Sequence, residues 1–338
     1  MWFTPRHTPI GIEISTTSLR AVQLRRAGAA WAVHDQVTLP RTESAASFTS
    51  EQARRLVGVL RRRGFAGRRV VVSLPNRDVI RGLFEVEGKD AGDPFLAVAR
   101  DIERTHHLEP GGYELAAWLP PASGLQRKSA VCVTGCTHDT ARRVVGAFAA
   151  VGYDAAAIDG RATALGRVVE SPGDRLTVAL DIEHESAELV LLNDGSVVYQ
   201  RPLMDAGLDQ THRRLADKGL SPEAAEHGLR TLGLADAQNP QGQMVRDVLL
   251  AYVQNLVQEA RPALDYAARM YVDYPVGRLA VVGPGAKVPL LDYELRQQLG
   301  YDAAPLECAV ALTSAVEPDF AVPLGLALHP QEVSWAVA

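Results

Sequence analysis

The sequence contains the same kind of segment twice, at 11–24 and at 179–195. Each copy runs from an apolar strand through an acidic residue and a short polar turn into a second apolar strand, which predicts a β-hairpin. Backbone N–H groups and hydroxyls at the tip of such a hairpin are able to hold a phosphate. Two copies therefore predict two related domains whose hairpin tips face each other across a cleft.

Length and composition allow two such domains. The chain has 338 residues, of which 47% are hydrophobic and 22% charged, and this is ordinary usage for a globular protein. The net charge of −5 gives no indication of a nucleic-acid partner. The only marked basic run, at 61–69, is predicted to be the solvated end of a helix, because the helix dipole favours positive side chains there. Contact with a membrane surface or an acidic partner is the alternative.

Membrane and redox signals point to the cytoplasm. No window approaches the run of about eighteen apolar residues that spans a bilayer, and the segment 1–10 lacks the apolar core of a signal peptide. Cys132, Cys136 and Cys308 fit a reducing compartment. Because no second pair of ligands accompanies Cys132 and Cys136, buried thiols are expected rather than a zinc site.

The first domain is expected at 1–172 and carries an insertion. A strand at 31–40, a helix at 50–63 opened by Ser50, and a buried strand at 68–76 follow the first hairpin. A different unit then occupies 81–154. It is predicted to hold, in order, a strand, a helix at 94–108, strands at 113–120 and 129–135, and a helix at 138–152.

The second domain is expected at 173–338. A helix at 161–170 returns to the first domain, and the turn residues at 171–174 mark the crossing. A helical subdomain at 208–275 follows the second hairpin and is broken by a polar loop at 235–243, and a strand at 278–283 comes next.

Four later segments, together with the two hairpins, carry a family resemblance. In this order and at these separations the chain resembles the type IV pilus assembly protein PilM family, which is related in fold to the division protein FtsA. The resemblance covers nearly the whole chain and implies an α/β, actin-like (ribonuclease H-like) two-domain fold with an inserted FtsA/PilM-type subdomain. The four segments are 208–233, 253–270, 279–300 and 319–329.

The resemblance also implies a nucleotide site between the domains. In the family the acidic positions, here Glu13 and Asp181, help to place a hydrated Mg²⁺, so these two are the metal candidates. The matching nucleotide positions are Glu13, Ser15, Thr16, Thr17 and Ser18 in the first hairpin, Asp181, Glu183 and Ser186 in the second, Glu226 and Arg230 in a helix, and Gly283, Gly285 and Lys287 in a glycine-containing loop.

Several of these positions depart from the family pattern. Ser15 and Glu183 stand where glycine is usual, and glycine there lets the backbone approach the phosphates. Glu183 and Glu185 bring carboxylates toward the phosphates, and like charges about 4 Å apart repel by roughly 1 to 4 kcal/mol. Leu229 replaces a lysine, and Pro284 enters the adenine loop. We therefore expect ATP and Mg²⁺ to bind weakly or not at all.

The acidic residues of the hairpins have a second interpretation. Glu13 and Asp181 can equally be strand-end acids that hydrogen bond turn amides and cap the hairpins. No residue is assigned a catalytic role, because no nucleophile has a recognisable base beside it. A scaffold is favoured first, ATP binding without turnover second, and an active ATPase or sugar-kinase-like enzyme third.

The resemblance implies scaffold work at a pilus or secretion platform. In the family, the protein lies at the inner face of the inner membrane and binds the short cytoplasmic end of a membrane partner, PilN, in a groove between the first domain and the insertion. Membrane association is then expected through the partner only, and self-association is left open. A polymerising role like that of FtsA is less favoured, because 331–338 is too short for a membrane helix. The expected partner-binding residues are His106, His107, Leu108 and Pro110.

Overall fold

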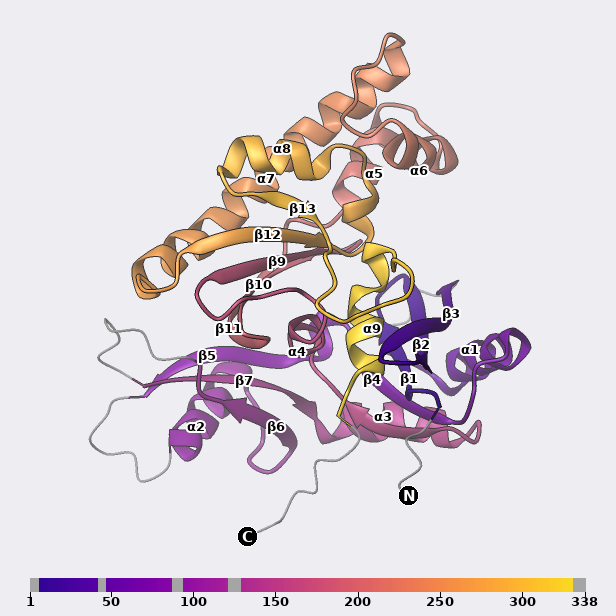
Figure 1. The fold of residues 1–338 in the computed structure, drawn as a ribbon, viewed down its shortest axis with the longest axis vertical. Coiled ribbons are helices and arrows are strands. Elements are labelled where there is room, and N and C mark those ends of the chain that lie inside the picture. The colour runs from indigo at the N-terminus through magenta and orange to yellow at the C-terminus, as the bar shows by residue number, and fades with distance from the viewer. Residues whose placement is uncertain (1–5, 42–46, 87–93, 121–128, 331–338) are drawn as a thin grey trace.

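Two five-stranded sheets with the same topology form the body of the molecule (Figure 1). The computed structural model describes residues 6–41, 47–86, 94–120 and 129–330, so the expectation about 331–338 and part of that about 1–10 lie outside the described residues. Each sheet joins a three-stranded antiparallel meander to two parallel strands, and this repeat includes both predicted hairpins. The first sheet has the order β3-β2-β1-β4-β8 and the second has the order β11-β10-β9-β12-β13.

The strands of the first sheet are β1 (Ile10–Ile14), β2 (Ser18–Ala27), β3 (Ala30–Pro40), β4 (Arg69–Ser73) and β8 (Asp154–Ile158). Those of the second sheet are β9 (Leu176–Ile182), β10 (Ala187–Asn193), β11 (Ser196–Leu203), β12 (Val276–Val282) and β13 (Ala303–Pro305).

Two helices, α1 (Ser50–Arg63) and α3 (His138–Ala149), cover one face of the first sheet. The range predicted for α1 is confirmed, but its N-cap is Thr49 rather than Ser50. The Thr49 side chain accepts the N–H of Gln52, whose side chain accepts that of Thr49, so the two residues form a capping box. Ser50, one residue later, already has helical geometry.

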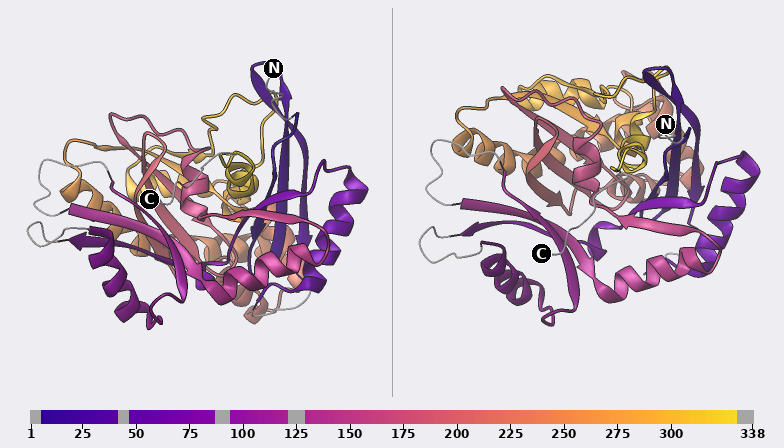
Figure 2. Two further views of the ribbon diagram at one scale, coloured as in Figure 1. Left: turned by 90° about the horizontal axis from the view of Figure 1, so that it is seen from below. Right: turned by 60° about the horizontal axis from the view of Figure 1, so that its bottom comes forward.

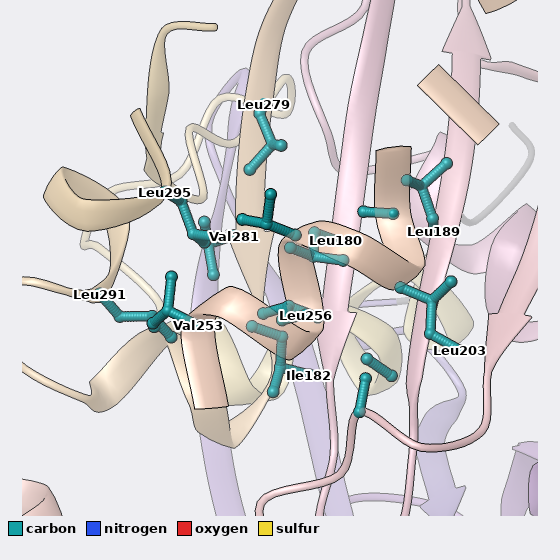
Figure 3. Packing of buried hydrophobic residues seen from close by; sticks show 14 of the residues in the cluster. Leu180, Ile182, Leu189, Leu203, Val253, Leu256, Leu279, Val281, Leu291 and Leu295 are labelled. Atoms are coloured by element: carbon teal, nitrogen blue, oxygen red, sulfur yellow. The ribbon is translucent and has the colours of Figure 1, made fainter. Parts of the chain in front are cut away.

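The second sheet is covered mainly by α7 (Pro240–Met270), whose apolar face packs on β9 and β12 (Figure 3). Val253 and Leu256 of α7 lie against Leu180 and Val281 of those strands. Helices occupy most of the region predicted to be helical, with a break at 232–239 rather than 235–243. Three shorter helices complete this side: α5 (Asp209–Asp217), α6 (Pro222–Thr231) and α8 (Leu291–Leu299).

Two short helices lie between the sheets, α4 (Arg161–Gly166) and α9 (Ala321–Ala327) (Figure 2). They cross so closely that a Cβ on Gly325 would lie 2.0 Å from the carbonyl oxygen of Ala164. The prediction of a helix at 161–170 is wrong at its end, because α4 stops at Gly166. The chain then turns, and Val169 pairs with Cys308 in an isolated β-bridge.

The inserted unit forms a three-stranded sheet, β5 (Ile80–Val86), β7 (Ser129–Thr137) and β6 (Tyr113–Trp118), in the order β5-β7-β6. Helix α2 (Pro94–His106) packs on it through Val98 and Ile102. The unit contacts β11 of the second sheet, where the Trp118 indole donates to the carbonyl oxygen of Val197 over 2.7 Å. Cys132 and Cys136 are buried in β7, as expected of structural thiols.

Among the described residues, no helix is both long enough and apolar enough to cross a membrane.

Candidate functional site

The tip of the first hairpin is closed by its own serine. Ser15 donates its N–H to the carbonyl oxygen of Ser18 over 2.9 Å. The Ser15 hydroxyl oxygen in turn accepts the N–H of Thr17 at 3.4 Å and that of Ser18 at 3.3 Å. Residue 15 is the position where the family carries glycine, so the added side chain occupies the amides that would otherwise face a phosphate.

Arg20 joins the two hairpins. It lies directly across from Glu13 in the β1–β2 register and donates to that carboxylate over 2.8 Å. It also donates to both carboxylate oxygens of Glu183 in the second hairpin, at 2.8 and 2.6 Å, and to the carbonyl oxygen of Asp319 at 3.0 Å. Such a fork-to-fork contact fixes orientation as well as distance.

Arg161 contacts the same acidic residues from a separate element, α4. It begins α4, immediately after Gly160, and its guanidinium binds the carboxylates of Glu13 and Asp181 and lies 3.4 Å from that of Glu183. Two arginines and three acids thus form one buried charge cluster between the sheets. Its members and their exposed fractions are Glu13 0%, Asp181 1%, Arg20 3%, Arg161 5% and Glu183 8%.

Burial and ion pairing set the protonation of this buried charge cluster. Burial raises the pKa of Glu13 to about 7 and that of Asp181 to about 6, against the opposing effect of the arginines. Burial also acts to raise the pKa of Glu183, but Arg20 and Arg161 outweigh it and the pKa is lowered. Three carboxyls share two guanidinium charges, so a proton on Glu13 or Asp181 balances the cluster near neutral pH.

A hydrated Mg²⁺ with its phosphates does not fit these residues as they are arranged. The carboxylates of Glu13 and Asp181, which the resemblance assigns to the metal, both bind Arg161 instead. The cation between the two acids is therefore a guanidinium. Within the part of the chain that the structure describes, no group of three or more His, Cys, Asp or Glu is arranged to hold a metal ion. The alternative role of Glu13 and Asp181 as hairpin caps is not seen either, since their carboxylates pair with arginines.

The remaining hairpin residues are only partly enclosed. Thr16 and Ser18 are half-buried and Thr17 is exposed at the first tip. Ser186, at the second tip, is buried and its hydroxyl accepts from the amide of Asn76 at 3.3 Å. A small cleft of 170 Å³ separates the two tips and is lined by residues of both. The tips therefore do face each other, as predicted, across a space already bridged by arginine.

The glycine loop after β12 packs tightly against the tip of β9. Gly283 has φ of 76°, and a Cβ there would lie 2.5 Å from the Asp181 carboxylate oxygen. A Cβ on Gly285 would lie 2.4 Å from the Ile182 side chain. Both glycines are thus required by contacts within the chain. Lys287, which ends this loop, forms ion pairs with Glu317 and, at 2.7 Å, with Asp319.

Glu226 and Arg230 lie on α6, farther out along the cleft. The Glu226 carboxylate accepts from Arg230 at 2.7 Å and contacts His212 at 2.9 Å. The hydrogen bond from His212 lowers the pKa of Glu226 to about 2, and Arg230 adds to this effect while partial burial opposes it. These two predicted nucleotide positions are therefore paired with each other.

Sequence reasoning missed the two arginines of the buried charge cluster. A signal existed for Arg20, because it stands between the apolar Leu19 and Ala21, two residues after the polar turn, and a short hairpin places it opposite Glu13. No comparable signal marked Arg161. It stands in a sequence of small residues, and only the crossing of α4 between the sheets brings it to the acids.

A second concave feature lies between the first sheet and the inserted unit. It is an apolar groove of 490 Å³ at the ends of β4 and β8. One wall comes from β6 and β7 and another from α3, where Val145 is 41% exposed. The lining residues are Leu74, Val79, Glu114, Leu115, Ala116, Thr134, Gly135, Cys136, Ala141, Val145, Ala155, Ile158, Asp159 and Gly160.

The residues predicted to bind a partner lie outside this groove. His106 and His107 are exposed at the end of α2, and Pro110 is exposed in the turn that follows. Leu108 turns inward and packs against the core of the small sheet. None of the four lines the groove.

The paired hairpin sheets, with two crossing helices and a cleft between them, form an actin-like fold. A chain of the PilM-PilN type IV pilus biogenesis complex has this fold with a TM-score of 0.75 and 24% identity, over 96% of this chain and 98% of that chain. This confirms the expected fold.

Other solved structures share the fold more distantly. The ethanolamine utilization protein EutJ from Carboxydothermus hydrogenoformans matches with a TM-score of 0.55 and 14% identity, over 96% of this chain and 90% of that one. MreB5 of Spiroplasma citri, bound to ADP, matches with a TM-score of 0.52 and 10% identity, over 96% and 95%. No protein-family model matches the chain.

Proposed function

We propose that this chain is a PilM-like scaffold of a type IV pilus or related secretion assembly platform. It works in the cytoplasm at the inner face of the inner membrane and binds the short cytoplasmic tail of a PilN-like membrane protein. The proposal is supported by the likeness to a chain of the PilM-PilN complex over nearly the full length of both chains. The observation that carries it is the apolar groove between the first sheet and the inserted unit.

The groove suits an extended peptide. Leu115 and Ala116 of β6 and Ala155 of β8 contribute to its lining, and β6 and β8 are both edge strands of their sheets. An edge strand presents unpaired backbone N–H and C=O groups, so a peptide is able to add to it as a further strand. The apolar side chains of the floor then select alternate residues of that peptide.

The nucleotide cleft is proposed to be structural in this chain. The buried charge cluster places arginine where the family has Mg²⁺, and the Ser15 hydroxyl takes the tip amides. An enzyme acting on a phosphate needs open donors and a metal at these positions. Without them the cleft serves to hold the two halves together, and the protein acts through its surfaces.

The peptide site makes a first prediction. Replacing Val145 by glutamate should weaken binding of the tail peptide at least tenfold, or about 1.4 kcal/mol, because a carboxylate would enter an apolar groove. Val145 is 41% exposed, so the fold should tolerate the change. Val272→Glu is the matched control, since Val272 is 51% exposed and does not line the groove. Calorimetric titration of the synthetic tail into each variant measures the difference.

Equal affinities for the two glutamate variants would place the peptide elsewhere. The pair His106→Ala with His107→Ala then becomes the informative comparison, because those residues are exposed at the end of α2 and do not line the groove. We expect that pair to affect binding less than Val145→Glu.

The nucleotide cleft makes a second prediction. MgATP at millimolar concentration should leave the melting temperature of the chain unchanged, whereas a ligand at a hundred times its Kd adds about 2.7 kcal/mol. The double variant Ser15→Gly with Glu183→Gly should gain measurable binding, because it frees the tip amides and removes the Glu183 carboxylate, which would repel a phosphate. Thermal shift with and without MgATP tests both proteins. A clear shift for the unmodified chain would refute a structural role for the cleft.

A further inference from the structure

Seven exposed arginines gather at one end of the first domain. They come from separate segments: the residues before β1, the end of β2, the end of α1 and the turn that leads into β4. We name this surface the basic end face, and its members are Arg6, Arg25, Arg61, Arg62, Arg63, Arg68 and Arg69.

Hydrogen bonds hold these segments side by side. The Gln23 amide donates to the carbonyl oxygens of both Thr8 and Ala66, at 2.9 and 2.7 Å. Arg26 donates its N–H to the carbonyl oxygen of Arg6 at 2.9 Å, and the His34 ring contacts the carbonyl oxygen of Gly64 at 3.0 Å. The fold of the domain therefore fixes the positions of the segments that carry these arginines.

The charges of the basic end face are largely uncompensated. Arg63 pairs with Asp35 at 2.7 Å, and Arg69 lies 3.9 Å from Asp154. Among the described residues no acidic side chain pairs with Arg6, Arg25, Arg62 or Arg68. The rings of His7 and His34 also lie here with their centroids 4.6 Å apart, and burial together with the neighbouring His34, Arg25 and Arg6 lowers the pKa of His7.

The electrostatic asymmetry is large for this chain. The formal net charge of the chain is −5, whereas the basic end face holds seven arginines and two aspartates. The rest of the chain therefore carries a larger negative charge than the chain as a whole. Between Arg6 and the Arg68–Arg69 pair lies a shallow depression of 260 Å³, whose lining includes His7 but no Phe, Tyr or Trp. A broad positive surface without a groove for bases is better suited to a flat, negatively charged surface such as a membrane than to a nucleic acid.

We propose that the basic end face binds the anionic phospholipids of the membrane that carries the partner. The inference rests on the proposed function, because a chain tethered to a membrane protein's tail is held close to the bilayer. Each arginine near an anionic surface adds a modest attraction, and a weak lipid contact combined with a weak peptide contact gives firm attachment. The chain then has two attachments to the membrane, one through the partner's tail and one through the lipids.

Vesicle co-sedimentation tests the basic end face without any partner. The full chain should bind vesicles of phosphatidylcholine with about one-third phosphatidylglycerol, should not bind phosphatidylcholine alone, and should dissociate in about 0.5 M salt. The triple variant Arg6→Gln, Arg62→Gln and Arg68→Gln should bind at least roughly tenfold more weakly.

The control removes the same charge from elsewhere. Arg100→Gln, Arg214→Gln and Arg269→Gln change three exposed arginines outside the basic end face, so the net charge of the two triple variants is equal. Equal loss of vesicle binding in both would show a net-charge effect and overturn the proposal. So would absence of binding to the anionic vesicles, or tighter binding to polyglutamate, which would assign the surface to an acidic protein.

The two proposals fail separately. None of the three arginines changed here lines the apolar groove. The triple variant should therefore bind the tail peptide in solution as the unmodified chain does, whereas Val145→Glu should bind anionic vesicles normally. Loss of peptide binding in the arginine variant would contradict the independence of the two surfaces.

Discussion

Replacing Arg161 by methionine is expected to lower the free energy of unfolding by about 3 to 5 kcal/mol, because it leaves buried carboxylates without a counter-charge. Arg161 pairs with Glu13 and Asp181, which are 0% and 1% exposed, and water cannot take its place without opening the domain interface. Urea denaturation followed by tryptophan fluorescence gives the difference between variant and parent.

Two further variants separate charge from packing. Arg54→Met removes an exposed arginine that pairs with Glu51, and such surface pairs are worth at most about 1 kcal/mol. Adding Glu13→Gln and Asp181→Asn to Arg161→Met removes the stranded charges and should recover part of the loss. If Arg161→Met costs no more than Arg54→Met, the cluster does not hold the halves together.

The crossing of α4 and α9 gives the second large effect. Gly325→Ala should destabilise the chain by about 3 kcal/mol or more, because overpacking against rigid backbone forces the helices apart. The new Cβ would lie 2.0 Å from the carbonyl oxygen of Ala164 and 2.5 Å from its carbonyl carbon. Differential scanning calorimetry measures the change.

Gly146→Ala is the matched control for this prediction. Gly146 also lies within a helix, but a Cβ there would meet nothing within 4 Å. That substitution should stabilise by about 0.5 to 1 kcal/mol, since alanine favours helix over glycine. Opposite signs are therefore expected from the same chemical change. A stabilising Gly325→Ala would show that the helices do not approach as described.

Most of the fold could be predicted because it rests on local patterns. Alternating Ile10, Ile12 and Ile14 define a strand by themselves, and the helical spacing of Val253, Leu256 and Ala260 defines α7. Local patterns are weaker at the ends of elements. They could not distinguish Thr49 from Ser50 as the N-cap of α1.

The candidate site was only half predictable. The positions of Glu13, Asp181 and Glu183 followed from the hairpins and the resemblance, but what their carboxylates contact depends on Arg161, which lies on a separate element, 148 positions from Glu13 and 20 from Asp181. The sequence suggested that Glu183 brings its carboxylate toward the phosphates. The structure shows that it turns onto Arg20. Contacts between elements decide such questions, and no periodicity encodes them.

The buried charge cluster also has a consequence for the order of folding. Its contacts join residues distant along the chain, 163 positions apart for Arg20 and Glu183 and 148 for Arg161 and Glu13. Contacts of such long range form only after the local ones, because closing a long loop costs chain entropy before it gains any contact. Until both sheets exist, these acids and arginines stay hydrated and keep the domain interface wet. Water leaves that interface only when all the charges meet. We therefore expect the two halves to dock in a single step, and only after both have folded.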